Sequence, residues 1–258
     1  MIPVLFEIGP LKIHSFGLMV LVSFLVSAKL VTMELKRRGL KPDHLEGYPM
    51  WALLGGIVGA RLYWMAEHFD RVLADPLGGI IGGAGLTWYG GLLGGAAATL
   101  FLAHRHKQKL WDLCDAFAPG LAASYGIGRI GCQLSGDGDY GPPSDLPWAM
   151  GYPNGVVPTP PGVTVHPTPV YEILMMIPVV WILWSLRKRA AQPGWLFGVY
   201  LVLVGIERWI SEIFRDRAPD VLTMGMSQAQ WLSVGAILFG LFLVATRRST
   251  HGASTATS

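Results

Sequence analysis

Charged residues are scarce in this chain. Of its 258 residues only 14% are Asp, Glu, Lys or Arg, whereas soluble globular domains contain about 25%. Hydrophobic residues make up 52% of the chain, and the mean hydropathy is +0.43. This composition excludes a soluble enzyme and a nucleic-acid-binding protein, and it predicts an integral membrane protein of the all-α class.

Three other features are missing as well. Only two cysteines are present, Cys114 and Cys132, so no disulfide framework is expected. The N-terminus has no basic segment followed by a small-residue cleavage site, and we expect the first membrane helix to act as the targeting element. No internal repeat and no second domain are recognisable, which predicts a single transmembrane bundle over residues 1–248.

Long apolar segments are plentiful, and they are rich in glycine. A membrane-spanning helix needs about 20 apolar residues, and the 33 glycines are typical of helices that pack closely within a bilayer. The ten Trp and eight Tyr fit aromatic belts at the membrane surfaces. The pattern predicts seven spans, over residues 14–35, 48–67, 80–104, 112–134, 168–187, 194–213 and 227–246.

Lys and Arg are distributed unevenly between the two sets of connecting loops. One set holds twelve of them and the opposite set holds four. Because loops rich in Lys and Arg stay in the cytoplasm, we expect the N-terminus outside and the C-terminus inside. The twelve are Lys36, Arg37, Arg38, Lys41, Arg105, Lys107, Lys109, Arg187, Lys188, Arg189, Arg247 and Arg248, and the four are Lys12, Arg71, Arg215 and Arg217.

The segments outside these spans have distinct compositions. Residues 136–167 are rich in Pro, Gly and Asp and contain no Lys or Arg, which predicts an ordered extracytoplasmic cap. Residues 1–13 are interpreted as a short interfacial helix. The Ser/Thr-rich residues 249–258 are predicted to be a disordered cytoplasmic tail.

Three arginines lie within predicted spans: Arg61, Arg129 and Arg208. A guanidinium at membrane depth costs roughly 2.5–3.5 kcal/mol on insertion scales, so such a residue usually has a function. All three spans run outward, and at 1.5 Å per residue Arg208 lies about 20 Å along its span. The arginines are therefore expected at similar depth towards the outer leaflet, where a phospholipid headgroup is the nearest anion.

Purely structural interpretations of these residues remain open. Arg61 can form an ion pair with Glu67 or Glu172, and Arg208 can pair with Glu212 four residues later on the same helix face. The paired glycines, which occur at 55–56, 78–79, 82–83, 90–91 and 94–95, are more typical of helix packing than of phosphate binding. His14 and His166 stand at predicted extracytoplasmic helix starts, where either can act in catalysis or cap the helix.

Taken in order along the chain, these motifs resemble the prolipoprotein diacylglyceryl transferase family over nearly the whole length. Any one motif is weak, but six in the expected order form a specific signal. They are Ile13 to Met19, Gly59-Ala60-Arg61, Trp88-Tyr89-Gly90-Gly91 through Gly94, Gly128-Arg129-Ile130-Gly131-Cys132 through Gly136 with Tyr140 and Gly141, His166 through Tyr171-Glu172, and Arg208 to Glu212 with Phe214-Arg215.

The resemblance implies an enzyme that moves the diacylglyceryl group of phosphatidylglycerol to the lipobox cysteine of a prolipoprotein signal peptide. A thioether forms and glycerol phosphate leaves, at the outer face of the bacterial inner membrane. The implied partners are phosphatidylglycerol, prolipoproteins and membrane lipids, with no nucleic acid, no metal and no soluble cofactor.

Several positions depart from the pattern that many family members share, and they leave the proton acceptor open. The histidine expected before the paired glycines of the third span is Tyr89. The other departures are Phe16 for Tyr, Cys132 and Ser135 for Asn, Asp137 for Glu, and one additional residue, Gly138 or Asp139, before Tyr140.

We expect a mechanism in which Arg129 and Arg208 bind the phosphodiester from two sides and Glu212 orients Arg208. The thiol must lose its proton, because a free cysteine has a pKa of about 8.5. Tyr89 is the first candidate for the base, followed by Asp137, Asp139 and His166. The expected substrate contacts are Arg61, Arg129, Arg208, Ser135, Gly90, Gly141 and His14.

Two other functions compete with the transferase. Buried arginines in glycine-rich helices also suit an anion transporter, although the polar residues gather in the outer half of the predicted bundle. A non-catalytic lipid-binding paralogue is the second alternative, and the substituted site residues are its main support.

Overall fold

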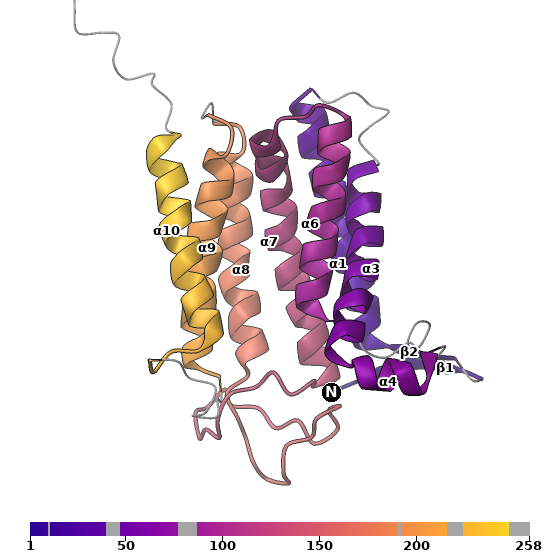
Figure 1. The fold of residues 1–258 in the computed structure, drawn as a ribbon. Helices are drawn as coiled ribbons and strands as arrows, with labels where there is room; N and C mark the ends of the chain where they lie inside the picture. The colour runs from indigo at the N-terminus through magenta and orange to yellow at the C-terminus, as the bar shows by residue number, and fades with distance from the viewer. Residues whose placement is uncertain (10, 40–46, 77–86, 190–191, 216–223, 248–258) are drawn as a thin grey trace, which may run out of the picture. The chain divides into compact units, whose positions relative to one another are not determined.

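The computed structural model describes residues 1–258 except 10, 40–46, 77–86, 190–191, 216–223 and 248–258. Its described elements are mostly helices (Figure 1). Along the chain they are β1 (Val4–Ile8), β2 (Leu11–His14), α1 (Ser15–Arg37), α3 (Gly47–Glu67), α4 (Phe69–Ala74), α6 (Trp88–Arg105), α7 (Leu110–Ser135), α8 (Thr168–Leu186), α9 (Trp195–Ile213) and α10 (Gln228–Thr246).

Each of the seven predicted spans coincides with a long helix. Both ends agree to within two residues, except in the third segment, whose residues 80–86 lie outside the described part. Three helices, α1, α8 and α10, are long and apolar enough to cross a membrane by length and composition. Seven crossings and their orientation stay predictions.

The short helix expected over residues 1–13 is wrong. The segment forms an antiparallel hairpin in which Val4 pairs with His14 and Glu7 with Lys12. A Gly-Pro pair in its middle is a turn signal that interrupts a helix, and Gly9 has a positive φ of 60°. His14 therefore ends a strand directly before α1.

The described residues fall into two compact units. Unit 1 contains Met1–Leu30 and Cys114–Ser258, and unit 2 contains Val31–Leu113. The single bundle predicted over residues 1–248 stays a prediction, as does the tail at 249–258, which lies outside the described residues.

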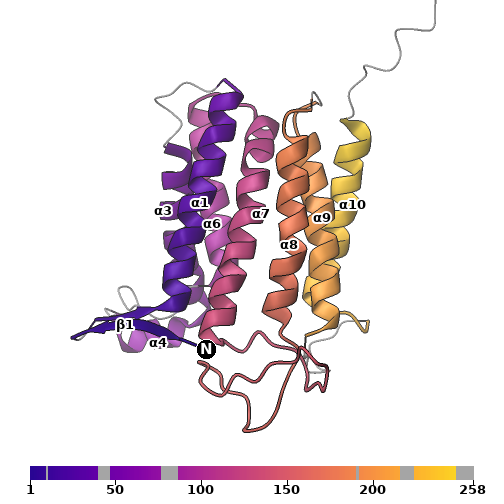
Figure 2. The same ribbon diagram turned by 180° about the vertical axis from the view of Figure 1, so that it is seen from behind.

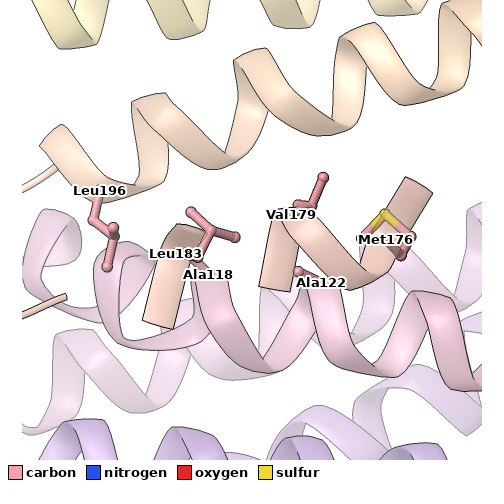
Figure 3. Close-up of a cluster of buried hydrophobic side chains, with 6 residues drawn as sticks. All are labelled: Ala118, Ala122, Met176, Val179, Leu183 and Leu196. Atoms are coloured by element: carbon pink, nitrogen blue, oxygen red, sulfur yellow. The ribbon is translucent and has the colours of Figure 1, made fainter. Parts of the chain in front are cut away.

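In unit 1 the helices α7, α8, α9 and α10 lie in that order in both views (Figure 1, Figure 2). Small residues on α7 let α8 approach, and six buried side chains fill the space between α7, α8 and α9 (Figure 3). They are Ala118, Ala122, Met176, Val179, Leu183 and Leu196.

Polar contacts define where two helices of unit 1 begin. The buried Asp115 of α7 accepts hydrogen bonds from the backbone N–H groups of Gly194 and Phe197, at 2.9 and 2.8 Å. It thereby satisfies free donors in the first turn of α9. Ser227 and Gln230 form a reciprocal capping box at the start of α10.

In unit 2 glycines bring α3 and α6 into backbone contact. A Cβ atom placed on Gly59 would overlap the carbonyl oxygen of Gly90, and one placed on Gly94 would overlap that of Gly55. This is the helix-packing role predicted for these glycines. The pairs at 78–79 and 82–83 lie outside the described residues.

Candidate active site

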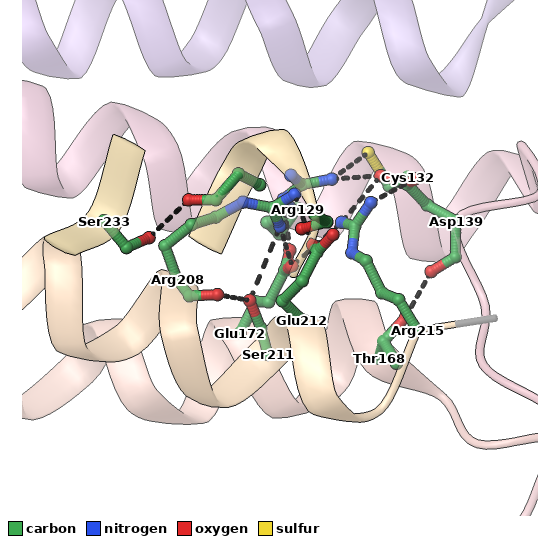
Figure 4. Close-up of polar contacts among 12 residues, drawn as sticks. Arg129, Cys132, Asp139, Thr168, Glu172, Arg208, Ser211, Glu212, Arg215 and Ser233 are labelled. Atoms are coloured by element: carbon green, nitrogen blue, oxygen red, sulfur yellow. Dashed lines mark hydrogen bonds and ion pairs between the residues drawn. The ribbon is translucent and has the colours of Figure 1, made fainter. Parts of the chain in front are cut away.

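Three arginines and two glutamates from different helices of unit 1 converge at one point (Figure 4). Arg129 comes from α7 and Glu172 from α8, while Arg208 and Glu212 come from α9. Arg215 follows just after α9, where its backbone N–H still bonds the Glu212 carbonyl at 3.3 Å. The spacing of four residues puts Arg208 and Glu212 on one face of α9, and Arg215, seven residues after Arg208, continues that face just beyond the helix end.

Glu172 is the common partner of all three arginines. Its Oε1 lies 2.9 Å from Arg215 Nη2 and 3.4 Å from Arg208 Nη1, and its Oε2 contacts Arg129 Nε. The side chain is completely buried, with 0% exposure. A buried carboxylate is stable only when charge partners and hydrogen bonds replace water, and here three guanidiniums provide them.

Asp139 is a second shared carboxylate, and it is carried by the cap segment. Both nitrogens of the Arg215 fork bind it, at 2.7 Å to Oδ1 and 3.1 Å to Oδ2, and Arg129 Nη1 also contacts Oδ2. Burial alone would raise the pKa of Asp139, but Arg215 and Arg129 outweigh burial and lower it below the ordinary value. Asp139 is therefore an anion at physiological pH.

The predicted ion pair between Arg208 and Glu212 is confirmed. Arg208 Nη2 lies 2.8 Å from Glu212 Oε2. Its Nη1 also reaches Ser211 Oγ and Glu172 Oε1, both at 3.4 Å. The Arg208 guanidinium is thus held by its own helix and by α8, which fixes its direction in the cluster.

Formal charges of the directly ion-paired groups in this cluster balance, and two further carboxyl groups lie close by, Glu207 of α9 and Asp137 of the cap. Arg129, Arg208 and Arg215 contribute three positive charges, and the contacting carboxylates of Asp139, Glu172 and Glu212 contribute three negative ones. A ligand anion that enters the cluster gives it an excess negative charge, unless the anion replaces one of these carboxylates. Of the three, only Asp139 is substantially exposed, at 34% of its side chain against 0% and 1%.

Gly141 of the cap makes a close contact with the end of α9. Its backbone N–H donates to the His166 carbonyl at 2.9 Å. A Cβ atom at this position would overlap the Phe214 carbonyl oxygen and lie 2.8 Å from His166 Cβ. Gly141, which the sequence predicts as a substrate contact, therefore has a packing role, since only glycine lets the cap approach the end of α9 next to Arg215.

Aromatic stacking and hydrogen bonds order the rest of the cap. Tyr140 stacks on Tyr152 with ring centroids 4.0 Å apart, and Tyr152 Oη donates to Gln133 Oε1 of α7 at 2.9 Å. Burial raises the pKa of Tyr152 to about 12, so this tyrosine stays protonated. These contacts tie the segment to α7, and its role as an extracytoplasmic cap stays a prediction.

His166 lies beside an apolar groove. Its Nδ1 is 3.1 Å from the Tyr171 hydroxyl, which accepts a hydrogen bond from Trp148 Nε1 at 2.9 Å. The groove has a volume of about 480 Å³ and is lined by Leu146, Trp148, His166, Tyr171, Leu174 and Phe214.

Other predicted site residues of unit 1 have local roles in the structure. Ser135 is buried and donates to the Cys132 carbonyl at 3.2 Å. Asp137 accepts a hydrogen bond from the Asp139 backbone at 3.3 Å. His14 has an exposed side chain at the end of β2.

Among the residues that the structure describes, one group of side chains has ligand atoms close enough for a metal ion. Atoms of Cys132, Asp137 and Asp139 lie within 4.8 Å of one another. However, Arg129 Nη1 is 3.6 Å from the Cys132 sulfur, and two guanidiniums already contact Asp139. These positive charges oppose a cation, and we assign no metal to this group.

Arg61, Tyr89 and Gly90 belong to unit 2. The Arg61 guanidinium lies over the Trp64 ring, 4.6 Å from its centroid. The exposed Tyr89 ring is 6.5 Å from that of Tyr63. Gly90 is buried against α3. Their proposed roles rest on the sequence.

Sequence reasoning missed three partners of the predicted clamp. Arg215 and Glu172 occur in the family motifs, and Asp139 is a candidate base, but the sequence assigns none of the three to the phosphate clamp. The spacing of seven residues between Arg208 and Arg215 was the available signal. Nothing local indicated that Glu172 and Asp139 would join them.

Comparisons with known proteins agree with this arrangement. The family model described as prolipoprotein diacylglyceryl transferase matches residues 3–246. A protein named phosphatidylglycerol–prolipoprotein diacylglyceryl transferase from Clostridium tetani is 32% identical over 93% of this chain and 96% of its own. One of the same name from Solidesulfovibrio magneticus is 33% identical over 98% and 97%. The chain belongs to the prolipoprotein diacylglyceryl transferase family.

Proposed function

We propose that this protein transfers the diacylglyceryl group of phosphatidylglycerol to the lipobox cysteine of a prolipoprotein. The buried cluster of three arginines, in a chain of this family, is the observation that carries the proposal. It is a membrane enzyme, and we place it in the bacterial inner membrane with seven spans. Its active site faces the outer leaflet, below the cap at 136–167.

The chemistry is a substitution at carbon. The cysteine sulfur forms a bond to the glycerol carbon, the bond from that carbon to the phosphate oxygen breaks, and glycerol phosphate leaves with the electron pair. Arg129 and Arg208 bind the phosphodiester through their parallel N–H donors and stabilise the charge that develops on the leaving group. Glu172 and Glu212 hold both guanidiniums in position.

The thiol proton needs an acceptor, and the candidates differ in their surroundings. Asp139 is a poor base, because two arginines lower the pKa of its carboxyl. Within the described part of the chain Asp137 forms no ion pair with an arginine, and its carboxylate accepts a hydrogen bond from the Asp139 backbone beside the cluster. Tyr89 remains our first candidate, with Asp137 and His166 next, and substitution has to decide among them.

Family membership favours the transferase over the two competing functions. The related proteins carry the transferase name along nearly their whole length, and neither anion transport nor a purely binding role has comparable support. The remaining Ser135, Gly90, Gly141, Arg61 and His14 are proposed substrate contacts or supports of the same site.

The test is phosphatidylglycerol-dependent thioether formation on a synthetic lipobox peptide, followed by mass spectrometry. We expect Arg129→Ala to abolish product while the protein still inserts in the membrane. Arg71→Ala, which removes an exposed arginine of α4, is the matched control and should retain activity. Full activity in Arg129→Ala would reject the phosphate clamp, and no activity in the wild-type protein would reject the function.

A further inference from the structure

The three carboxylates of the arginine cluster differ in how they are held. Glu172 and Glu212 project from helices and are buried. Asp139 projects from the cap, and its side chain is 34% exposed. Only this carboxylate combines contact with two arginines and direct access to solvent.

The contacts of Asp139 are those that a phosphodiester would make. Two oxygens of one anionic group accept from the fork of Arg215, and one of them also contacts Arg129. A phosphodiester likewise offers two non-bridging oxygens with one negative charge, and arginine binds both groups in the same bidentate geometry.

The main chain at Asp139 is anchored, whereas the side chain is partly exposed. The buried Thr168 hydroxyl donates to the Asp139 carbonyl oxygen. The side chain itself is 34% exposed, so the proposed movement of the carboxylate is a rotation about its side-chain bonds towards solvent.

We propose that in the resting enzyme Asp139 occupies the place beside Arg129 and Arg215 where the two non-bridging oxygens of a lipid phosphodiester bind, and that it leaves when the lipid enters. Arg215 thereby joins Arg129 and Arg208 as a phosphate contact, and Asp139 becomes a determinant of substrate charge. The inference rests on the proposed function, because it concerns how the transferase selects its lipid. One monoanion replaces another, so the balance of three positive and three negative charges is kept.

This exchange disfavours a dianion. A phosphate monoester carries close to two negative charges at neutral pH, and it would leave the buried cluster with an excess negative charge, which is costly at low dielectric. Cleavage converts the bound diester into such a monoester, glycerol phosphate. Return of Asp139 then helps to release the product.

The test compares Asp139→Asn with Asp145→Asn, a change of an exposed aspartate of the same cap. Binding of dihexanoyl phosphatidylglycerol to the detergent-solubilised protein is measured by calorimetry. Without the competing carboxylate, the Kd should fall by about fivefold or more, in line with the strength of charged hydrogen bonds. The control should match the wild type. An unchanged or higher Kd in Asp139→Asn would overturn the proposal, since a merely structural Asp139 predicts weaker binding.

A second measurement keeps the proposal testable if Asp139→Asn does not fold. Inhibition of the wild-type transfer reaction is compared for dimethyl phosphate, a monoanion, and glycerol phosphate, a dianion. For the wild type we expect dimethyl phosphate to inhibit at a concentration no higher than that needed of glycerol phosphate. In a folded Asp139→Asn protein, inhibition by glycerol phosphate should become stronger than it is in the wild type. A strong wild-type preference for the dianion would refute charge selection by Asp139. An absence of thioether product in the wild type would instead refute the proposed function.

Discussion

Substitution of Glu172 by Gln tests whether one buried carboxylate holds the arginine cluster together. The change keeps the volume of the side chain but removes the negative charge that faces Arg129, Arg208 and Arg215. Loss of one partner from a buried ion pair costs about 3–5 kcal/mol. Because the amide oxygen still accepts a hydrogen bond, we expect the lower end, about 3 kcal/mol of unfolding free energy.

That loss is large enough to measure by thermal unfolding in detergent. At about 2–4 °C per kcal/mol for a chain of about this size, the Tm should fall by about 6–12 °C. Glu67→Gln removes a charge from an exposed glutamate of α3 and should change stability by no more than about 0.5 kcal/mol. A Tm of Glu172→Gln within about 2 °C of the wild type would show that the three arginines do not depend on this carboxylate.

Three further predictions use other parts of the molecule. Gly141→Ala should lower transfer activity by about tenfold or more, because the new Cβ would overlap the Phe214 carbonyl and displace the cap by a fraction of an ångström. Gly235→Ala is the control and should retain activity, since a Cβ there meets nothing within 4 Å. Tyr89→Phe should cost at least about tenfold in transfer rate if its hydroxyl takes the thiol proton, and full activity would make it a packing residue. The pKa of Asp139 is lower in the folded protein than the value of about 3.9 in the unfolded chain. The ionised Asp139 carboxylate therefore stabilises the fold fully above about pH 4, and this stabilisation is lost as the pH falls through the lower folded pKa. Unfolding midpoints of the wild type should therefore drop more steeply below about pH 4 than those of Asp139→Asn, and parallel curves would contradict this.

Helix positions were predictable because their signals are local. Apolar runs of about 20 residues mark the long helices, and the observed α8 and α9 end within two residues of the predicted segments. The Arg208–Glu212 pair was predictable for the same reason, since four residues on a helix bring two side chains to one face. The N-terminal hairpin was missed although its Gly-Pro turn signal is equally local.

Sequence alone determined that this is an apolar, helical chain of the transferase family with arginines within its helices, because composition, periodicity and motif order are properties of the chain itself. Which carboxylates neutralise those arginines was decided only by the tertiary structure. Glu172 lies 36 residues from Arg208 and 43 from Arg215, and Asp139 lies 76 from Arg215. Contacts at such separations depend on how α7, α8, α9 and the cap pack, and no spacing rule within a single helix specifies that packing.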